Sequence, residues 1–173
     1  DTYVAGNGTS VSSSVSKTTN NFVKNYERDI RSAKIGIPAG KLSGGATLPQ
    51  NVEGYYKNDV SKELLLAAMQ SSQDFYNGKH FGSSTIGPSL KGYLDYVKAV
   101  RGGTNLSDII NNQFNAASSS VGALSNSFSS QITTDNTKML SAYDVMQQNL
   151  VYIKLDVMQA LNITVDYVDG DGD

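Results

Sequence analysis

The stretch MLSAYDVMQQNLVYIKLDVMQAL, residues 139–161, carries a regular apolar pattern along its whole length. Its apolar side chains recur at steps of three or four residues, a spacing that is typical of one buried stripe on a helix. At about 1.5 Å per residue such a helix is about 35 Å long, enough to span a domain. We therefore expect a central core helix here. The stripe consists of Met139, Tyr143, Met146, Leu150, Ile153, Val157 and Leu161, with a flanking row of Leu140, Val151, Leu155 and Met158.

The length, charge and composition of the chain limit the classes of protein to which it can belong. Its 173 residues suffice for one domain, residues 1–173, that buries roughly 70% of the unfolded surface. The net charge is −2, from 14 basic and 16 acidic residues, which argues against nucleic-acid binding. The absence of cysteine excludes disulfides and thiolate metal sites, and no apolar run approaches the roughly 18 residues of a transmembrane helix. Because the first residue is Asp1 rather than Met, we expect a processed or trimmed chain, or a piece of a longer protein.

Further segments show helical apolar periods bounded by capping residues and glycines. They are residues 12–33, 61–77, 88–100 and 107–128, after a polar and flexible segment at residues 1–10. A turn at residues 133–136 favours an antiparallel return into the central helix. No segment is a convincing strand, so the predicted fold is all-α, an antiparallel bundle of four long helices plus a short helix. The charged residues Glu27, Arg28, Asp29 and Arg31 are interpreted as a solvated face of the first helix.

Residues 37–56, IPAGKLSGGATLPQNVEGYY, have no helical period and are rich in glycine and proline. A segment of this length without regular structure is unusual inside a compact domain and tends to carry function or an interface. The alternative interpretation is a long surface crossover between two helices.

The residues that could support metal binding or catalysis are few. His80 is the only histidine, and it has no second histidine or cysteine to complete a zinc site. The tail DYVDGDGD, residues 166–173, alternates carboxylates as the start of an EF-hand loop does, but it ends before a bidentate glutamate. Asp169, Asp171 and Asp173 are therefore weak candidates for binding divalent ions. The alternative is a terminal turn in which Asp side chains accept hydrogen bonds from backbone amides.

Several segments together resemble the second half of imelysin-like proteins from Bacteroides-like bacteria. The resemblance covers nearly the whole chain from Phe22 onward, in order and in spacing, although no single motif decides it. The segments are NYERDIRSAKIGIPAGKLSG (25–44), LPQNVEGYYKNDVSKELLLAAMQSSQDFYNGK (48–79), GPSLKGYLDYV (87–97), TDNTKMLSAYDVMQ (134–147) and the ending LNITVDYVDGDGD (161–173).

The resemblance implies an exported protein of a Gram-negative cell envelope, either periplasmic or attached to the outer membrane as a lipoprotein. Imelysin-like proteins consist of two related helical bundles and are linked to iron-regulated uptake, and one branch is classed as peptidases. This chain is then the C-terminal half, and the N-terminal half is its partner. The family signature, Gly-x-His-x-x-Glu, is absent, because His80 is followed by Phe81, Gly82 and Ser83. No catalytic residue is carried over, and whether the protein is an enzyme stays open.

Three functions stay open at this point. The first is binding, in which the chain lines a cleft, shared with the N-terminal half, for iron or an iron-bearing ligand. Candidates for this face are Lys34 for an anionic group, Glu53 as an oxygen ligand of a cation, Tyr55 as a hydrogen-bond donor, and Pro38. Iron is expected only in the two-domain parent, with no cofactor in this chain alone. The second function is a metallopeptidase with its catalytic residues in the N-terminal half, and the third is a structural helical surface protein.

Overall fold

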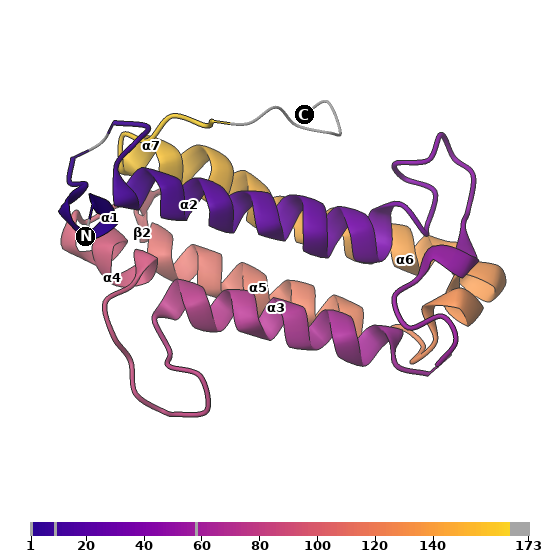
Figure 1. Cartoon of the computed structure of the whole chain (residues 1–173). Coiled ribbons are helices and arrows are strands. Elements are labelled where there is room, and N and C mark those ends of the chain that lie inside the picture. Colours follow the sequence, from indigo (N-terminus) through magenta and orange to yellow (C-terminus); the bar gives the residue numbers. More distant parts are fainter. Residues whose placement is uncertain (1, 9, 58, 167–173) are drawn as a thin grey trace.

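The computed structural model describes residues 2–8, 10–57 and 59–166, and these residues are mostly helical (Figure 1). The predicted helical class is therefore confirmed. The elements in chain order are α1 (Thr2–Ala5), α2 (Ser14–Lys24), η1 (Asn25–Gly36), η2 (Pro49–Asn51), α3 (Ser61–Asn77), α4 (Leu90–Tyr96), β1 (Val100–Arg101), β2 (Thr104–Asn105), α5 (Leu106–Gly122), α6 (Phe128–Val151), η3 (Tyr152–Val157) and α7 (Met158–Ala160).

The long elements surround a single core. α2 continues directly into the π-helical η1, and α6 continues through the π-helical η3 into α7, so each series forms one rod. The packed pairs close a ring, in which η1 lies on α6, α6 on α5, α5 on α3, and α3 on η1. Figure 1 shows the rod of α2 and η1 beside the rod of α6, η3 and α7, with α3 and α5 below them. Each rod therefore turns one face toward the core.

The stripe predicted for residues 139–161 is buried along the rod of α6, η3 and α7. Met139, Met146 and Leu150 are at most 1% exposed, and the stripe stays buried through η3. The flanking row is only partly buried, because Leu155 is 60% exposed. Leu155 follows Leu150 by five residues, which is about 140° further round a helix of 3.6 residues per turn, so its side chain faces away from the core.

The chain reverses between α5 and α6 earlier than the sequence predicts. The helix predicted for residues 107–128 ends at Gly122, and α6 already begins at Phe128. At this start the hydroxyl of Ser127 accepts a hydrogen bond from the amide of Ser130 at 3.3 Å. An N-cap of this kind satisfies one of the free amides of the first helical turn. Phe128 therefore belongs to α6 rather than to α5.

The turn predicted at residues 133–136 is instead a kink inside α6. Asp135 has non-helical dihedral angles, φ −158° and ψ 84°. The side chain of Gln131 spans the kink, donating to the Asp135 carbonyl at 2.8 Å and accepting from the Ser125 amide at 2.9 Å. The hydrogen-bonding residues that favour a turn in this sequence therefore interrupt the helix without ending it.

A short β-hairpin, formed by β1 and β2, begins at Val100, the last residue of the helix predicted for residues 88–100. α4 is shorter than predicted, and β1 pairs with β2 in antiparallel orientation. Gly102 and Gly103 make the turn with φ angles of 57° and 83°, the left-handed conformation that two-residue hairpin turns need. The prediction that the chain has no strand is wrong at this point.

The charged residues at the start of η1 form the predicted solvated face only in part. Arg28 and Asp29 are exposed, whereas Glu27 and Arg31 are each only 1% exposed. Because η1 is π-helical, its wider turns bring neighbouring side chains to the buried side together. Two charged side chains are therefore part of the core between η1 and the last rod.

Neutral amide side chains join α3 to α5. Asn77 and Asn111 exchange two hydrogen bonds, at 2.9 and 2.8 Å. Gln73 donates to Oδ1 of Asn111 at 3.2 Å and to Oδ1 of Asn115 at 3.0 Å. We call these four residues the amide ladder. It fixes the position of α3 along α5.

Gly78→Ala should destabilise the protein more than Gly82→Ala, although both glycines have left-handed backbones with φ angles of 72° and 66°. Each substitution carries a backbone cost of about 1–2 kcal/mol. A Cβ on Gly78 would also lie 2.5 Å from the carbonyl oxygen of Gly87, whereas nothing lies within 4 Å of a Cβ on Gly82. We expect this contact to add about 1–3 kcal/mol, measured by urea unfolding. Equal losses of stability in the two variants would contradict the close packing at residue 78.

Candidate binding groove

A groove runs between the rod of α2 and η1 on one side and α3 on the other. Its cavity volume is about 730 Å³, within the range of small-molecule sites. The charged side chains that line this first cavity are Asp29 and Lys34, both on η1. We call this feature the α3 groove. The rest of its polar lining is neutral and consists of Tyr3, Thr18, Asn21, Asn25, Ser71 and Ser72.

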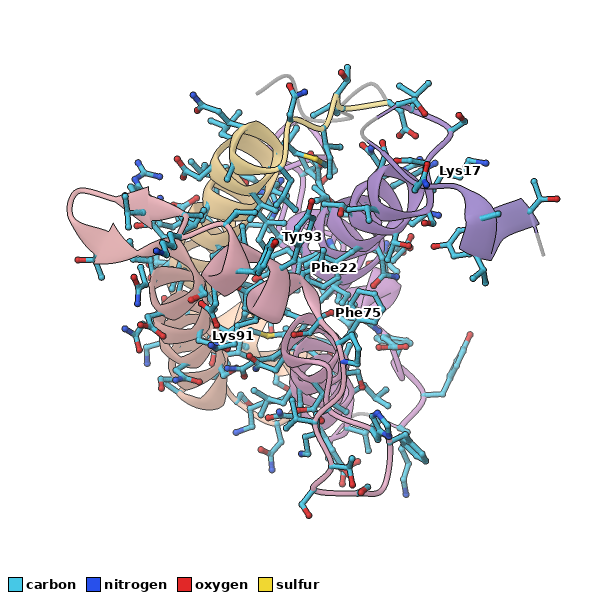
Figure 2. The ribbon with its side chains drawn as sticks, turned by 90° about the vertical axis from the view of Figure 1, so that its left-hand side faces the viewer. Lys17, Phe22, Phe75, Lys91 and Tyr93 are labelled. Atoms are coloured by element: carbon cyan, nitrogen blue, oxygen red, sulfur yellow. The ribbon has the colours of Figure 1, made fainter. Side chains whose placement is uncertain are left out.

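Aromatic rings form the middle of the α3 groove. Phe22 of α2 stacks on Phe75 of α3, with ring centroids 5.3 Å apart and planes 29° apart. Phe22 is 7% exposed, whereas Phe75 is 49% exposed. Figure 2 shows the two side chains together between α2 and α3. Phe75 therefore presents a large apolar surface to solvent above a buried aromatic partner, as residues of binding surfaces do.

A second cavity, of about 610 Å³, extends the groove toward α4. Tyr3, Thr18 and Phe75 line both cavities. The hydroxyls of Tyr3 and Thr18 are hydrogen bonded to each other, which ties α1 to α2 at the boundary between the cavities. His80 and Tyr93 lie in the lining of the second cavity. The two cavities together make one elongated groove along α3.

The predicted site residues Lys34 and Glu53 meet at one end of the α3 groove. Lys34 lines the first cavity, and its Nζ forms an ion pair with Oε2 of Glu53. The side chains are 17% and 44% exposed, respectively. Partly exposed ion pairs contribute little to stability, so a competing charged group can displace either partner at small cost. The structure thus brings a candidate anion-binding group and a candidate cation ligand together, each paired with the other.

The other two predicted site residues, Pro38 and Tyr55, are not in the lining of either cavity. Pro38 is buried, and its carbonyl accepts a hydrogen bond from the amide of Leu48 at 2.8 Å. Tyr55 is 41% exposed and lies edge-on against Tyr56, with ring centroids 5.5 Å apart. Pro38 therefore helps to fold the 37–56 segment, whereas Tyr55 is at the surface.

Large apolar side chains are exposed at both ends of α3. Tyr56 precedes the helix and is 100% exposed, and Phe81 and Ile86 follow it at 106% and 60% exposure. Figure 1 shows the loop after α3 extending away from the rods. Of the exposed apolar residues named here, Phe75 is the one that also lines the groove.

The described residues contain no ready-made metal site. The tail candidates Asp169, Asp171 and Asp173 lie outside the described ranges. Within those ranges, no group of three or more His, Cys, Asp or Glu is placed to hold a metal ion. Nor does any helix in the described part of the chain combine the length and apolar character that a membrane crossing requires.

Comparison of the chain with models of protein families, with curated proteins and with solved structures gave no match to any of the three. The resemblance to imelysin-like proteins therefore stays a prediction from the sequence segments.

Proposed function

We propose that this chain is a binding module, the C-terminal bundle of an imelysin-like cell-envelope protein that is periplasmic or attached to the outer membrane. Its helices make up one half of a two-bundle fold, an antiparallel bundle of four long helices plus a short helix. The α3 groove is one wall of a cleft shared with the N-terminal half. The observation that carries this proposal is the elongated groove with an exposed aromatic ring in its wall and a displaceable ion pair, Lys34 with Glu53, at one end.

The ligand in this proposal is an iron-bearing organic anion rather than a bare iron ion. Aromatic rings, hydroxyls and amides line the α3 groove, and such groups suit the surface of an organic molecule. The positive charge of Lys34 suits a carboxylate on that molecule, which would take the place of Glu53. The groove therefore recognises the organic part of the ligand, whereas the iron itself is held by its chelating groups.

Haemin and ferric citrate are probes that separate the two parts of this proposal. Haemin carries iron in a flat apolar ring with two carboxylates, whereas ferric citrate carries iron and carboxylates without an apolar surface. Calorimetric titration of the chain should show weak binding of haemin, and a two-domain parent should bind it more tightly. Binding of ferric citrate in preference to haemin would contradict the role of the aromatic wall.

Substitutions at the ion pair should change haemin affinity in opposite directions. Lys34→Met removes the cation that pairs with a haemin carboxylate and should weaken binding by about 10-fold to 100-fold, since a hydrogen bond to a charged group contributes about 1.5–3 kcal/mol. Glu53→Gln removes the competing carboxylate and should tighten binding up to about five-fold, because an exposed ion pair contributes about 0.2–1 kcal/mol. The measurement is the same calorimetric titration.

Lys41→Met is the matched control for Lys34→Met. Lys41 forms a comparable exposed ion pair, with Asp144 at 3.2 Å, but it does not line either cavity of the groove. Its substitution should leave haemin affinity unchanged. If Lys34→Met and Lys41→Met weaken binding equally, the effect is one of net charge and the assignment of Lys34 is wrong.

A further inference from the structure

The chain contains two Asn-Gly pairs, Asn7–Gly8 and Asn77–Gly78, and the fold places them in opposite environments. An asparagine side chain loses ammonia most readily when glycine follows it, because glycine has no Cβ to hinder the approach of its backbone nitrogen. This reaction needs no ligand, metal or enzyme. Each pair reacts only if the folded chain lets the two reacting atoms meet.

The reaction joins the backbone nitrogen of the glycine to Cγ of the asparagine. The nitrogen attacks Cγ and gives up its proton, a new C–N bond closes a cyclic succinimide, and the side-chain nitrogen leaves with that proton as ammonia. Water then opens the ring at either carbonyl carbon, which leaves aspartate or isoaspartate. The attack requires the nitrogen and Cγ to lie about 3–3.5 Å apart, so the asparagine side chain and the following amide must both be able to turn.

Asn7–Gly8 lies open to solvent between α1 and α2. Both residues are exposed, and Gly8 has a left-handed backbone with a φ angle of 87°. Among the described residues, nothing lies within 4 Å of the position that a Cβ on Gly8 would take. The carbonyl of the preceding residue, Gly6, accepts hydrogen bonds from the amide and the hydroxyl of Ser14, at 2.9 and 2.8 Å. The fold therefore holds the chain just before this pair and leaves the pair itself able to turn.

Asn77–Gly78 lies at the end of α3 and is held on both sides. The Asn77 side chain belongs to the amide ladder and exchanges two hydrogen bonds with Asn111, at 2.9 and 2.8 Å. The Gly78 amide donates to the carbonyl of Phe75 at 3.0 Å, and a Cβ on Gly78 would lie 2.5 Å from the carbonyl oxygen of Gly87. Bringing the Gly78 nitrogen to Cγ of Asn77 therefore requires all three hydrogen bonds to break.

We infer that Asn7 is a site of spontaneous deamidation and that the amide ladder keeps Asn77 from the same reaction. Deamidation of Asn77 would replace its N–H donor by a carboxylate oxygen and take one donor from Oδ1 of Asn111, so the ladder preserves the contact that fixes α3 on α5. At Asn7 the product adds a negative charge, and as isoaspartate an extra backbone carbon, to the segment that joins α1 to α2. This chemistry is independent of whether the α3 groove binds an iron-bearing ligand.

Incubation of the intact chain in water enriched in oxygen-18 measures both sites at once, because each ring opening adds a labelled oxygen atom. Trypsin places the two pairs in separate peptides, residues 1–17 and 63–79, which mass spectrometry follows. In the folded protein Asn77 should react about 10-fold to 1,000-fold more slowly than Asn7, the factor that corresponds to opening three hydrogen bonds. In urea that unfolds the chain, the two sites should react at similar rates. Equal rates in the folded protein would overturn the inference, and so would a rate at Asn7 that rises on unfolding as steeply as the rate at Asn77.

Asn111→Leu tests the role of the ladder, because it removes both hydrogen bonds to Asn77. It should accelerate the reaction at Asn77 by about 5-fold to 100-fold and leave the rate at Asn7, the internal standard, unchanged. Asn115→Leu is the matched control: it removes the contact with Gln73 at 3.0 Å but none with Asn77, so the rate at Asn77 should not change. Equal rates at Asn77 in the two variants would contradict protection by the ladder. The comparison of the two sites in the unaltered chain tests the inference even if a variant does not fold.

Discussion

Leu150→Asp should lower the melting temperature by about 8–16 °C. Leu150 is 1% exposed in the middle of the buried stripe, so the new carboxylate would be placed in an apolar core without a partner. Such a substitution costs about 4 kcal/mol or more, and in a domain of this size each kcal/mol lowers the melting temperature by about 2–4 °C. Thermal unfolding followed by circular dichroism measures the change.

Leu155→Asp is the control on the same rod. Leu155 is 60% exposed, so a carboxylate there remains hydrated and should lower the melting temperature by no more than about 2 °C. The two variants make the same chemical change five residues apart. If they melt at the same temperature, the stripe through α6 and η3 does not face the core.

Glu27→Leu should reduce the free energy of unfolding by about 3–5 kcal/mol. Glu27 is 1% exposed, and its carboxylate lies 3.5 Å from the ammonium group of Lys154, whose side chain is 12% exposed. Removing one member of a buried ion pair leaves the other charge without that partner, which costs far more than losing a surface pair. Urea unfolding at neutral pH provides the measurement.

Combining Glu27→Leu with Lys154→Met should restore most of the lost stability, because replacing both members of a buried pair with apolar groups is often nearly neutral. Asp29→Leu, at an exposed position on the same element, is the matched control and should cost less than about 1 kcal/mol. A cost for Glu27→Leu no larger than that of Asp29→Leu would show that Glu27 is hydrated rather than buried.

The sequence predicts most of this core because apolar periodicity reports burial directly. Met139 and Leu150 follow the helical period and are buried as expected. The period fails in the π-helical η1, where Arg31 is buried although its α-helical position predicts exposure. Local sequence does not reveal a π-helical turn, since its hydrogen bonds are decided by packing against the neighbouring rod.

The candidate site, too, could be predicted only in part from the local sequence, because its geometry depends on how the helices pack. Lys34 and Glu53 were found because they lie in or beside a segment without helical period. Their pairing with each other, and the position of Lys34 in a groove, depend on how η1 packs beside α3. The helical period of residues 61–77 predicts Phe75 on the inward side, so the sequence does not reveal its place in the groove. In the structure Phe75 lines both cavities of the groove and is 49% exposed.

The amide ladder between α3 and α5 has a consequence for the conditions under which the groove keeps its shape. Its four side chains carry no charge and do not titrate, so dissolved ions do not screen their hydrogen bonds and a change in acidity does not protonate them. The pairing of Lys34 with Glu53, by contrast, weakens as ionic strength rises. High salt should therefore loosen the charged end of the groove while α3 itself stays fixed on α5.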